Sequence, residues 1–224
     1  MLDRIDAELK RRYLPGMIQT FLGEFPNGFH DEKQIKQERE YKLAARELCL
    51  ELLGKDQFAL LLANEDWSEL FDRAKRLINK TNFIQPSFER PRLFEALQDA
   101  QKGPQFFTAL FGVLWVEANF FERFQDFCGT LEELDLLKWT YATYFVFLAD
   151  SQYGMFVKPE MLKKSLEISR YPLTYDPAPS AALYKGILKF SQWLKDSIVQ
   201  LEPQDLIDVH SFMWHMAPTG KWAE

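Results

Sequence analysis

The sequence has few of the residues that hold metals or cross-link small proteins. Among its 224 residues are only two cysteines, Cys49 and Cys128, and three histidines. Two isolated cysteines make neither a disulfide framework nor a zinc site, and they favour a reducing, cytoplasmic location. No histidine has a glutamate three residues before it, as the Glu-x-x-His pairs of a di-iron bundle require. We therefore predict no metal and no cofactor.

Glycine motifs and long apolar runs are missing as well. The ten glycines are scattered, and no Gly-x-Gly-x-x-Gly, Walker or Gly-x-Ser-x-Gly pattern occurs. The common nucleotide-binding and serine-hydrolase sites are therefore not favoured, although an enzyme is not excluded. The most apolar tract, residues 106–121, contains Glu117 and Asn119 and is shorter than the ~20 residues of a membrane helix. The charged start also lacks the apolar region of a signal peptide, so we expect a cytoplasmic protein without a membrane partner.

Apolar and aromatic side chains are abundant. Hydrophobic residues make up 47% of the chain and aromatic residues 15%, including 20 phenylalanines. This composition excludes a disordered chain, and the length is sufficient to bury a substantial core. The net charge of −6 argues against broad attraction to phosphate, although a local basic patch is still possible.

The apolar residues recur at helical spacing, and the alternation typical of strands hardly occurs. We expect helices at about residues 2–13, 15–22, 31–54, 58–62, 66–80, 91–100, 105–116, 120–127, 139–150, 159–169, 181–200 and 203–216. For 139–150, a strand is the alternative because of its β-branched and aromatic content. Residues 171–180 hold three prolines and are expected to form an extended crossing. Without repeats or linkers, the chain is predicted to be a single all-α domain, 1–224, with about ten helices.

The tract PQDLIDVHSFMWHM, residues 203–216, holds an aspartate, a serine and a histidine at helical spacing. On a helix, Gln204, Asp208, Ser211 and His215 share one narrow face. A catalytic triad needs histidine in the middle, whereas here the serine stands between Asp208 and His215. We therefore interpret this face as the solvated edge of an amphipathic helix and assign no catalytic residue.

His210 lies on the apolar side of the same helix, near Met213 and Trp214. Buried histidines usually have a hydrogen-bond partner and a structural role, and we prefer this interpretation. The alternative is a pocket between helices near His210, assembled from distant residues. The candidate ligand-binding residues are Tyr41, Glu117, Lys158 and His210. In the charged run 38–42, we expect the helix to bury Tyr41 and the charges to form internal salt bridges.

A basic ridge is the candidate nucleic-acid interface. It consists of Arg73, Arg76 and Lys80 on one predicted helix face, followed by Arg90 and Arg92. Such a ridge, with Phe83 and Phe88 nearby, can hold phosphates while aromatic rings stack on bases. The alternative is an ordinary solvated face, because Glu69 and Asp72 are placed to pair with the arginines. We prefer the solvated face.

Four stretches in this order resemble a family of uncharacterised bacterial all-helical proteins over nearly the whole chain. They are FLGEFPNGFHDEKQIKQEREYKLAA, TNFIQPSFERPRLFEAL, ATYFVFLAD with MFVKPEMLKK, and PQDLIDVHSFMWH. The last stretch is also similar to a tract in bacterial proteins of the methylation-dependent restriction type. The resemblance implies a bacterial or phage-related origin and a self-contained unit, but no activity and no catalytic residues. This chain has His210 where that tract has glutamine, which weakens a catalytic role for the histidine.

Two functions are consistent with the sequence. The first is a helical binding module that acts with a protein partner or nucleic acid, for example in DNA transactions or defence. The alternative is an enzyme or small-ligand-binding protein with a pocket between helices near His210.

Overall fold

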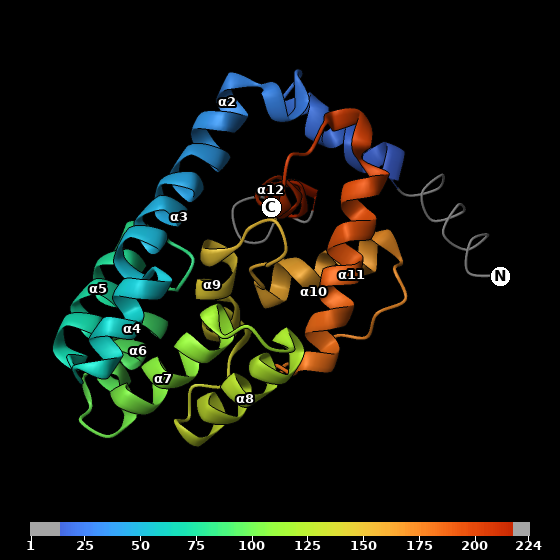
Figure 1. Ribbon diagram of the computed structural model, residues 1–224. Coiled ribbons are helices and arrows are strands. Elements are labelled where there is room, and N and C mark those ends of the chain that lie inside the picture. Colours follow the sequence, from blue (N-terminus) through green and yellow to red (C-terminus); the bar gives the residue numbers. More distant parts are fainter. Residues whose placement is uncertain (1–13, 217–224) are drawn as a thin grey trace.

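The computed structural model describes residues 14–216, and these residues form a helical fold without strands (Figure 1). The helical segments run, in chain order, over residues 14–24, Gly28–His30 (η1), Glu32–Gln34 (α2), Ile35–Arg39 (η2), Glu40–Leu53 (α3), Lys55–Ala63 (α4), Trp67–Lys80 (α5), Glu89–Gln98 (α6), Lys102–Trp115 (α7), Phe120–Glu133 (α8), Trp139–Ala149 (α9), Pro159–Ser169 (α10), Ala181–Ser197 (α11), Val199–Leu201 (η3) and Leu206–Met216 (α12). The predicted all-α class is confirmed. The helix expected at residues 2–13 lies outside the described residues.

Most of the predicted boundaries agree with the structure. Residues 171–180 contain no helix and connect α10 to α11, as the three prolines predicted. Two boundaries differ: the helix predicted over 120–127 continues to Glu133, and the helix predicted over 105–116 begins at Lys102, so that Gly103 and Pro104 lie in the first turn of α7. Proline is tolerated there, since the first backbone N–H groups of a helix have no partner within the helix. No described helix meets the length and apolarity needed to cross a membrane.

Helix α9 lies in the middle of the molecule. Every residue from Trp139 to Leu148 is buried, and Figure 1 shows α9 and α12 inside the outline formed by α3, α7, α8 and α11. A helix that is apolar all round is stable only when other helices cover every face. The strand alternative for this segment is therefore wrong.

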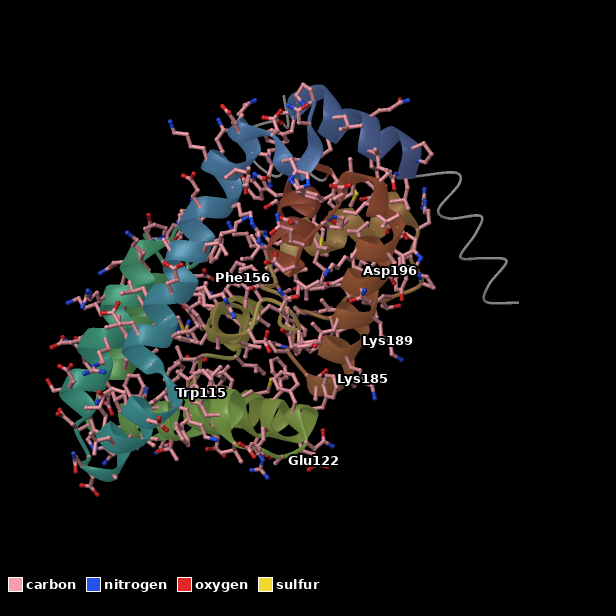
Figure 2. All side chains as sticks on the ribbon, turned by 45° about the horizontal axis from the view of Figure 1, so that its top comes forward. Trp115, Glu122, Phe156, Lys185, Lys189 and Asp196 are labelled. Carbon is pink, nitrogen blue, oxygen red and sulfur yellow. The ribbon has the colours of Figure 1, made fainter. Side chains whose placement is uncertain are left out.

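The connection between α9 and α10 is buried and held by two hydroxyl groups. The Tyr184 hydroxyl lies 2.9 Å from the Met155 N and 3.0 Å from the Met155 O, and the Val157 N–H donates to Thr143 Oγ1. Phe156 lies in the interior, whereas Lys185 and Lys189 project outward from α11 (Figure 2). These contacts fix the position of the next residue, Lys158, at the start of α10.

Candidate functional site

The polar stripe of α12 is buried, and its predicted exposure to solvent was wrong. Asp208 and Ser211 have no exposed surface, and the His215 side chain is 11% exposed. The segment η2 and the first turn of α3 pack against this face and present Arg39 and Lys42 to it. Asp208 and Ser211 therefore face two cations instead of water, and His215 faces the carboxylate of Glu24 at 3.0 Å.

Arg39 holds the beginning of α12 through a buried set of hydrogen bonds. Its Nη1 donates to Asp205 Oδ1 at 3.0 Å and to Asp208 Oδ1 at 2.7 Å. Its Nη2 donates to Asp205 Oδ2 at 2.9 Å and to Gln204 Oε1 at 3.1 Å. Asp205 also accepts the Ile207 N–H at the first turn of the helix. We call Arg39, Gln204, Asp205 and Asp208 the Arg39 clamp.

The charges of the clamp are stabilised only in part. Burial raises the pKa of Asp208, although the Gln204 N–H and Arg39 act in the opposite direction. The pKa of Arg39 is raised, because the hydrogen bonds and charges of Asp205 and Asp208 outweigh the burial that would lower it. The clamp removes one cation and two carboxylates from water, and this desolvation can cost more free energy than the ion pairs return. We infer that the clamp fixes where α12 begins more than it adds to overall stability.

A π-helical turn explains why Arg39 and Lys42 point to α12. Residues Ile35–Arg39 form this turn, with the Glu40 N–H bonded to the Ile35 carbonyl. A π turn contains one residue more than an α turn and shifts the following side chains by about 100° around the axis. A regular helical wheel through residues 31–54 therefore assigns these side chains to the wrong faces. Single π turns are frequent at functional sites.

Lys42 is fully buried and lies at the centre of a second polar group. Its Nζ donates to Glu38 Oε2 at 2.9 Å and Ser211 Oγ at 2.8 Å, and lies 3.5 Å from His210 Nδ1. Burial lowers the pKa of Lys42, although Glu38 and Asp208 act to raise it. Glu38 in turn lies 3.6 Å from His215 Nε2. Burial favours a higher pKa for Glu38, but the contacts with His215 and Lys42 outweigh it and lower the pKa.

His210 is buried next to Lys42, among aromatic rings. Its ring centroid lies 5.6 Å from those of Phe83 and Phe147 and 5.8 Å from that of Phe156. Burial, with the charges of Lys42 and Lys158, lowers the pKa of His210 well below its usual value. The ring is therefore neutral near pH 7, with Nδ1 facing the Lys42 ammonium. The Nε2 atom is buried without a hydrogen-bond partner among the described residues.

Ser211 and Lys42 have the contact of a serine–lysine pair but not its accessibility. The Ser211 hydroxyl donates to the Ile207 carbonyl at 2.9 Å, and the residue has no exposed surface. A serine nucleophile needs a free hydroxyl that a substrate can approach. We conclude that this contact stabilises the packing of α3 on α12.

The structure brings together three of the four candidate ligand-binding residues. Lys42 Nζ lies 5.5 Å from the Tyr41 ring centroid, and its charge acts on both His210 and Lys158. Tyr41 and His210 therefore contact Lys42, and Lys158 lies against Trp214, one helical turn from His210 on α12. Glu117 does not belong to this group, because its side chain is 89% exposed and pairs with Lys55.

Several members of the candidate basic ridge already donate to the protein. Arg73 bonds to Glu69 and to the Leu52 carbonyl at the end of α3. Arg90 donates to the Ile84 and Thr81 carbonyls, and Arg92 pairs with Asp135. Arg76 and Lys80 are exposed, and the surface around them includes Glu47 and Glu51. These neighbouring carboxylates favour an ordinary solvated face over a phosphate-binding surface.

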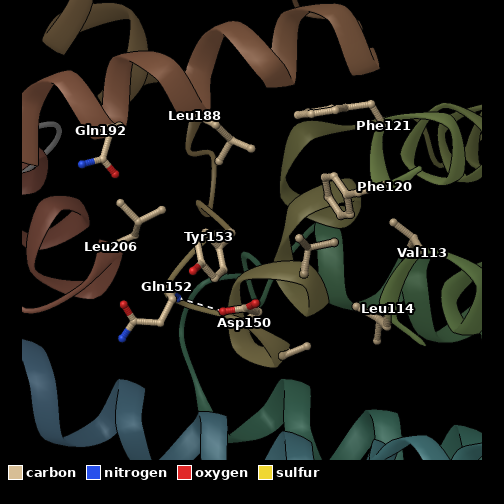
Figure 3. A pocket seen from close by; sticks show the side chains of 13 residues that line it. Val113, Leu114, Phe120, Phe121, Asp150, Gln152, Tyr153, Leu188, Gln192 and Leu206 are labelled. Carbon is tan, nitrogen blue, oxygen red and sulfur yellow. Dashed lines mark hydrogen bonds between the residues drawn. The ribbon is translucent and has the colours of Figure 1, made fainter. Parts of the chain in front are cut away.

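The structure also contains an apolar pocket that the sequence did not indicate. Its volume is about 410 Å³, and it lies where the ends of α7 and α9 meet the starts of α8 and α12 and the middle of α11. The pocket is lined by Val113, Leu114, Phe120, Phe121, Val146, Ala149, Asp150, Gln152, Tyr153, Gly154, Leu188, Gln192 and Leu206. Figure 3 shows Leu188 and Gln192 across the pocket from Asp150 and Gln152. The side chains that form its walls are apolar and at least partly buried, and its polar residues lie at the exposed rim.

The Arg39 clamp and the pocket are adjacent along the chain. The Leu206 N–H donates to the Ser151 carbonyl at 3.0 Å, which joins the start of α12 to the loop that carries Gln152 and Tyr153. Asp205 of the clamp directly precedes Leu206 of the pocket wall. The buried ion pairs therefore help to position one side of the pocket.

Sequence reasoning missed the clamp and the pocket for different reasons. The run of charges at Glu38, Arg39 and Lys42 was the available signal for the clamp. No pattern in the neighbouring sequence predicts that Asp205 and Asp208, far away in the chain, are the partners. The pocket had no signal, because its walls consist of ordinary core residues from five helices.

The comparisons with known proteins add no further assignment. No protein-family model, no curated protein and no solved structure was found to match the chain. Among residues 14–216, no group of three or more histidine, cysteine, aspartate or glutamate side chains is arranged to hold a metal ion. The resemblance to a bacterial family stays a prediction.

Proposed function

We propose that the protein binds a small, mainly apolar molecule in the pocket between α7, α8, α9, α11 and α12. The observation that carries this proposal is the pocket itself, with a volume of about 410 Å³, apolar walls and polar groups confined to the rim. Ligand-binding pockets commonly measure about 300–1,000 Å³ and have this arrangement. The proposal corresponds to the small-ligand alternative but places the ligand away from His210.

The rim favours a ligand that carries a hydrogen-bond donor. The Asp150 carboxylate bonds to the Gln152 N–H through Oδ1, which leaves its other oxygen as an acceptor. Gln192 uses its amide nitrogen to bond Asp196, so its carbonyl oxygen is also an acceptor. A hydroxyl or amino group on the ligand fits these acceptors, whereas a carboxylate would be repelled by Asp150.

A neutral fluorescent amine, N-phenyl-1-naphthylamine, tests the proposal. We expect its fluorescence to rise and saturate at one equivalent, and straight-chain alcohols to displace it. Each added methylene is expected to tighten binding about fourfold until the pocket is full, because burying one methylene contributes about 0.8 kcal/mol. Binding that does not saturate, or that ignores chain length, would contradict the proposal.

Two matched variants locate the binding site. Leu188→Trp fills the pocket and is expected to weaken dye binding by at least about tenfold, because the bulky ring occupies the ligand's volume. Leu60→Trp is the control, since Leu60 is 54% exposed on α4 and does not line the pocket. Equal affinity in both variants would place the dye elsewhere.

The hypothesis of nucleic-acid binding is tested in parallel. Fluorescence polarisation with short DNA and RNA at two salt concentrations measures any phosphate attraction. Salt-dependent binding that is lost in the double variant Arg73→Glu, Arg76→Glu would support the interface and count against a function limited to the pocket. We expect no such binding, because Arg73 is already paired with Glu69.

A further inference from the structure

Lys158 has no carboxylate partner among residues 14–216. Its Nζ lies 4.9 Å from the centroid of the Trp214 ring, and this is its closest identified interaction. The neighbouring lysines of α10 differ, because Lys163 pairs with Glu160 and Lys164 pairs with Glu167. The Lys158 ammonium is therefore balanced only by an aromatic face.

Three features of the fold disfavour a positive charge on Lys158. The residue is half-buried, and it directly precedes α10, where the positive end of the helix dipole lies. The fully buried ammonium of Lys42 is the third feature. Burial and then Lys42 lower the pKa of Lys158, and the opposing effects of Glu38 and Glu89 are weaker. Burial and the charges of both lysines lower the pKa of His210, so its ring is neutral and adds no positive charge of its own.

We propose that Lys158 is a reactive amine that condenses with a small aldehyde or ketone to form an imine. Lysines become nucleophilic when they are partly removed from water or when a nearby cation acts on them. Lys158 is half-buried, and the charge of the buried Lys42 acts on it. The neutral ε-amine attacks the carbonyl carbon and forms the C–N bond. The two protons of the amine nitrogen then pass to the oxygen, the C–O bond breaks as water leaves, and the C=N bond of the imine forms. The Trp214 face favours a planar, aromatic carbonyl compound, because such a ring can stack on it.

This site is separate from the apolar pocket. Lys158 directly precedes α10, and Trp214 lies near the end of α12. Neither residue lines the pocket. The two proposals therefore fail or succeed independently of each other.

Reductive trapping on the full chain tests the proposal. The protein is incubated with benzaldehyde and sodium cyanoborohydride near neutral pH, and labelled lysines are quantified by peptide mass spectrometry. We expect Lys158 to be labelled several-fold faster than Lys164, which is exposed on α10. We also expect half-maximal labelling of Lys158 at a lower pH than that of Lys164. Labelling in proportion to exposure, or the same pH profile for both lysines, would overturn the proposal.

A variant of the neighbouring cation separates reactivity from simple access. Lys42→Met removes the repelling charge, so labelling of Lys158 near neutral pH is expected to fall several-fold, with Lys164 unchanged. Circular dichroism establishes that the variant is folded, and if it is not, the pH profiles of the wild-type chain decide. Unchanged labelling of Lys158 in a folded Lys42→Met variant would overturn the role of the paired cations.

Discussion

Replacing Arg39 with methionine tests whether the buried clamp determines the packing of α12. The change removes four hydrogen bonds and leaves the carboxyl groups of Asp205 and Asp208 buried without their cation. Breaking a buried ion pair in this way typically costs about 3–5 kcal/mol. That is a large fraction of the roughly 5–15 kcal/mol that stabilises a typical domain, so the effect on unfolding will be large.

The cost of Arg39→Met is expected to depend on pH. Burial places the pKa of Asp208 above its usual 3.8 in the folded state. A carboxyl group with a raised pKa contributes stability below its unfolded pKa, and this contribution is lost as the pH rises through the folded pKa. Without Arg39, the folded pKa of Asp208 rises further. The difference in unfolding free energy between wild type and variant should therefore shrink as the pH falls from neutral through the raised folded pKa of Asp208.

Urea unfolding followed by far-ultraviolet circular dichroism measures both effects. Lys36→Met is the matched control, because Lys36 lies in the same π turn but is exposed, and we expect a change within about 0.5 kcal/mol. The double variant Arg39→Met, Asp208→Leu should recover roughly half of the loss, since apolar replacements of a buried pair are tolerated better than a single unpaired charge. A loss below about 1 kcal/mol for Arg39→Met, at every pH, would refute the reasoning.

Three further predictions concern single side chains. His210→Gln should make the protein more resistant to acid. The folded pKa of His210 lies below the unfolded value of 6.5, so the wild type loses stability as the pH falls below 6.5, by up to about 1.4 kcal/mol per pH unit. Urea unfolding midpoints at several pH values measure this difference. Gln34→Met should stabilise the fold by about 1–3 kcal/mol in the same assay, because the buried Gln34 amide has no hydrogen-bond partner among the described residues. Arg90→Ala should lower the free energy of unfolding by about 1–3 kcal/mol, because the Ile84 and Thr81 carbonyls lose their hydrogen-bond donor, and the melting temperature should fall accordingly. The exposed control Lys80→Ala should change the melting temperature little.

The sequence by itself determined the class of fold and most of its helices. Helical spacing of apolar residues is a local property, and a helix forms its backbone hydrogen bonds within one segment, so α5, α10 and α11 could be predicted from their own residues. The three prolines in 171–180 likewise fixed an extended connection, because proline lacks the N–H that a helix needs.

Tertiary structure decided which polar residues are buried. Asp208 and Ser211 lie on a helix face that the sequence pattern predicts to be solvated. They are buried because η2 and α3, more than 160 residues earlier in the chain, cover that face with Arg39 and Lys42. The π turn of η2 also shifts the helical register, which no periodicity through residues 31–54 indicates.

The pocket, too, exists only in the assembled fold. Val113, Leu188 and Leu206 are ordinary core residues in the sequence, and they line a cavity because their helices do not fill the space where their ends meet. A local pattern determines which residues avoid water, whereas the three-dimensional packing of helices determines where space remains and which charges meet.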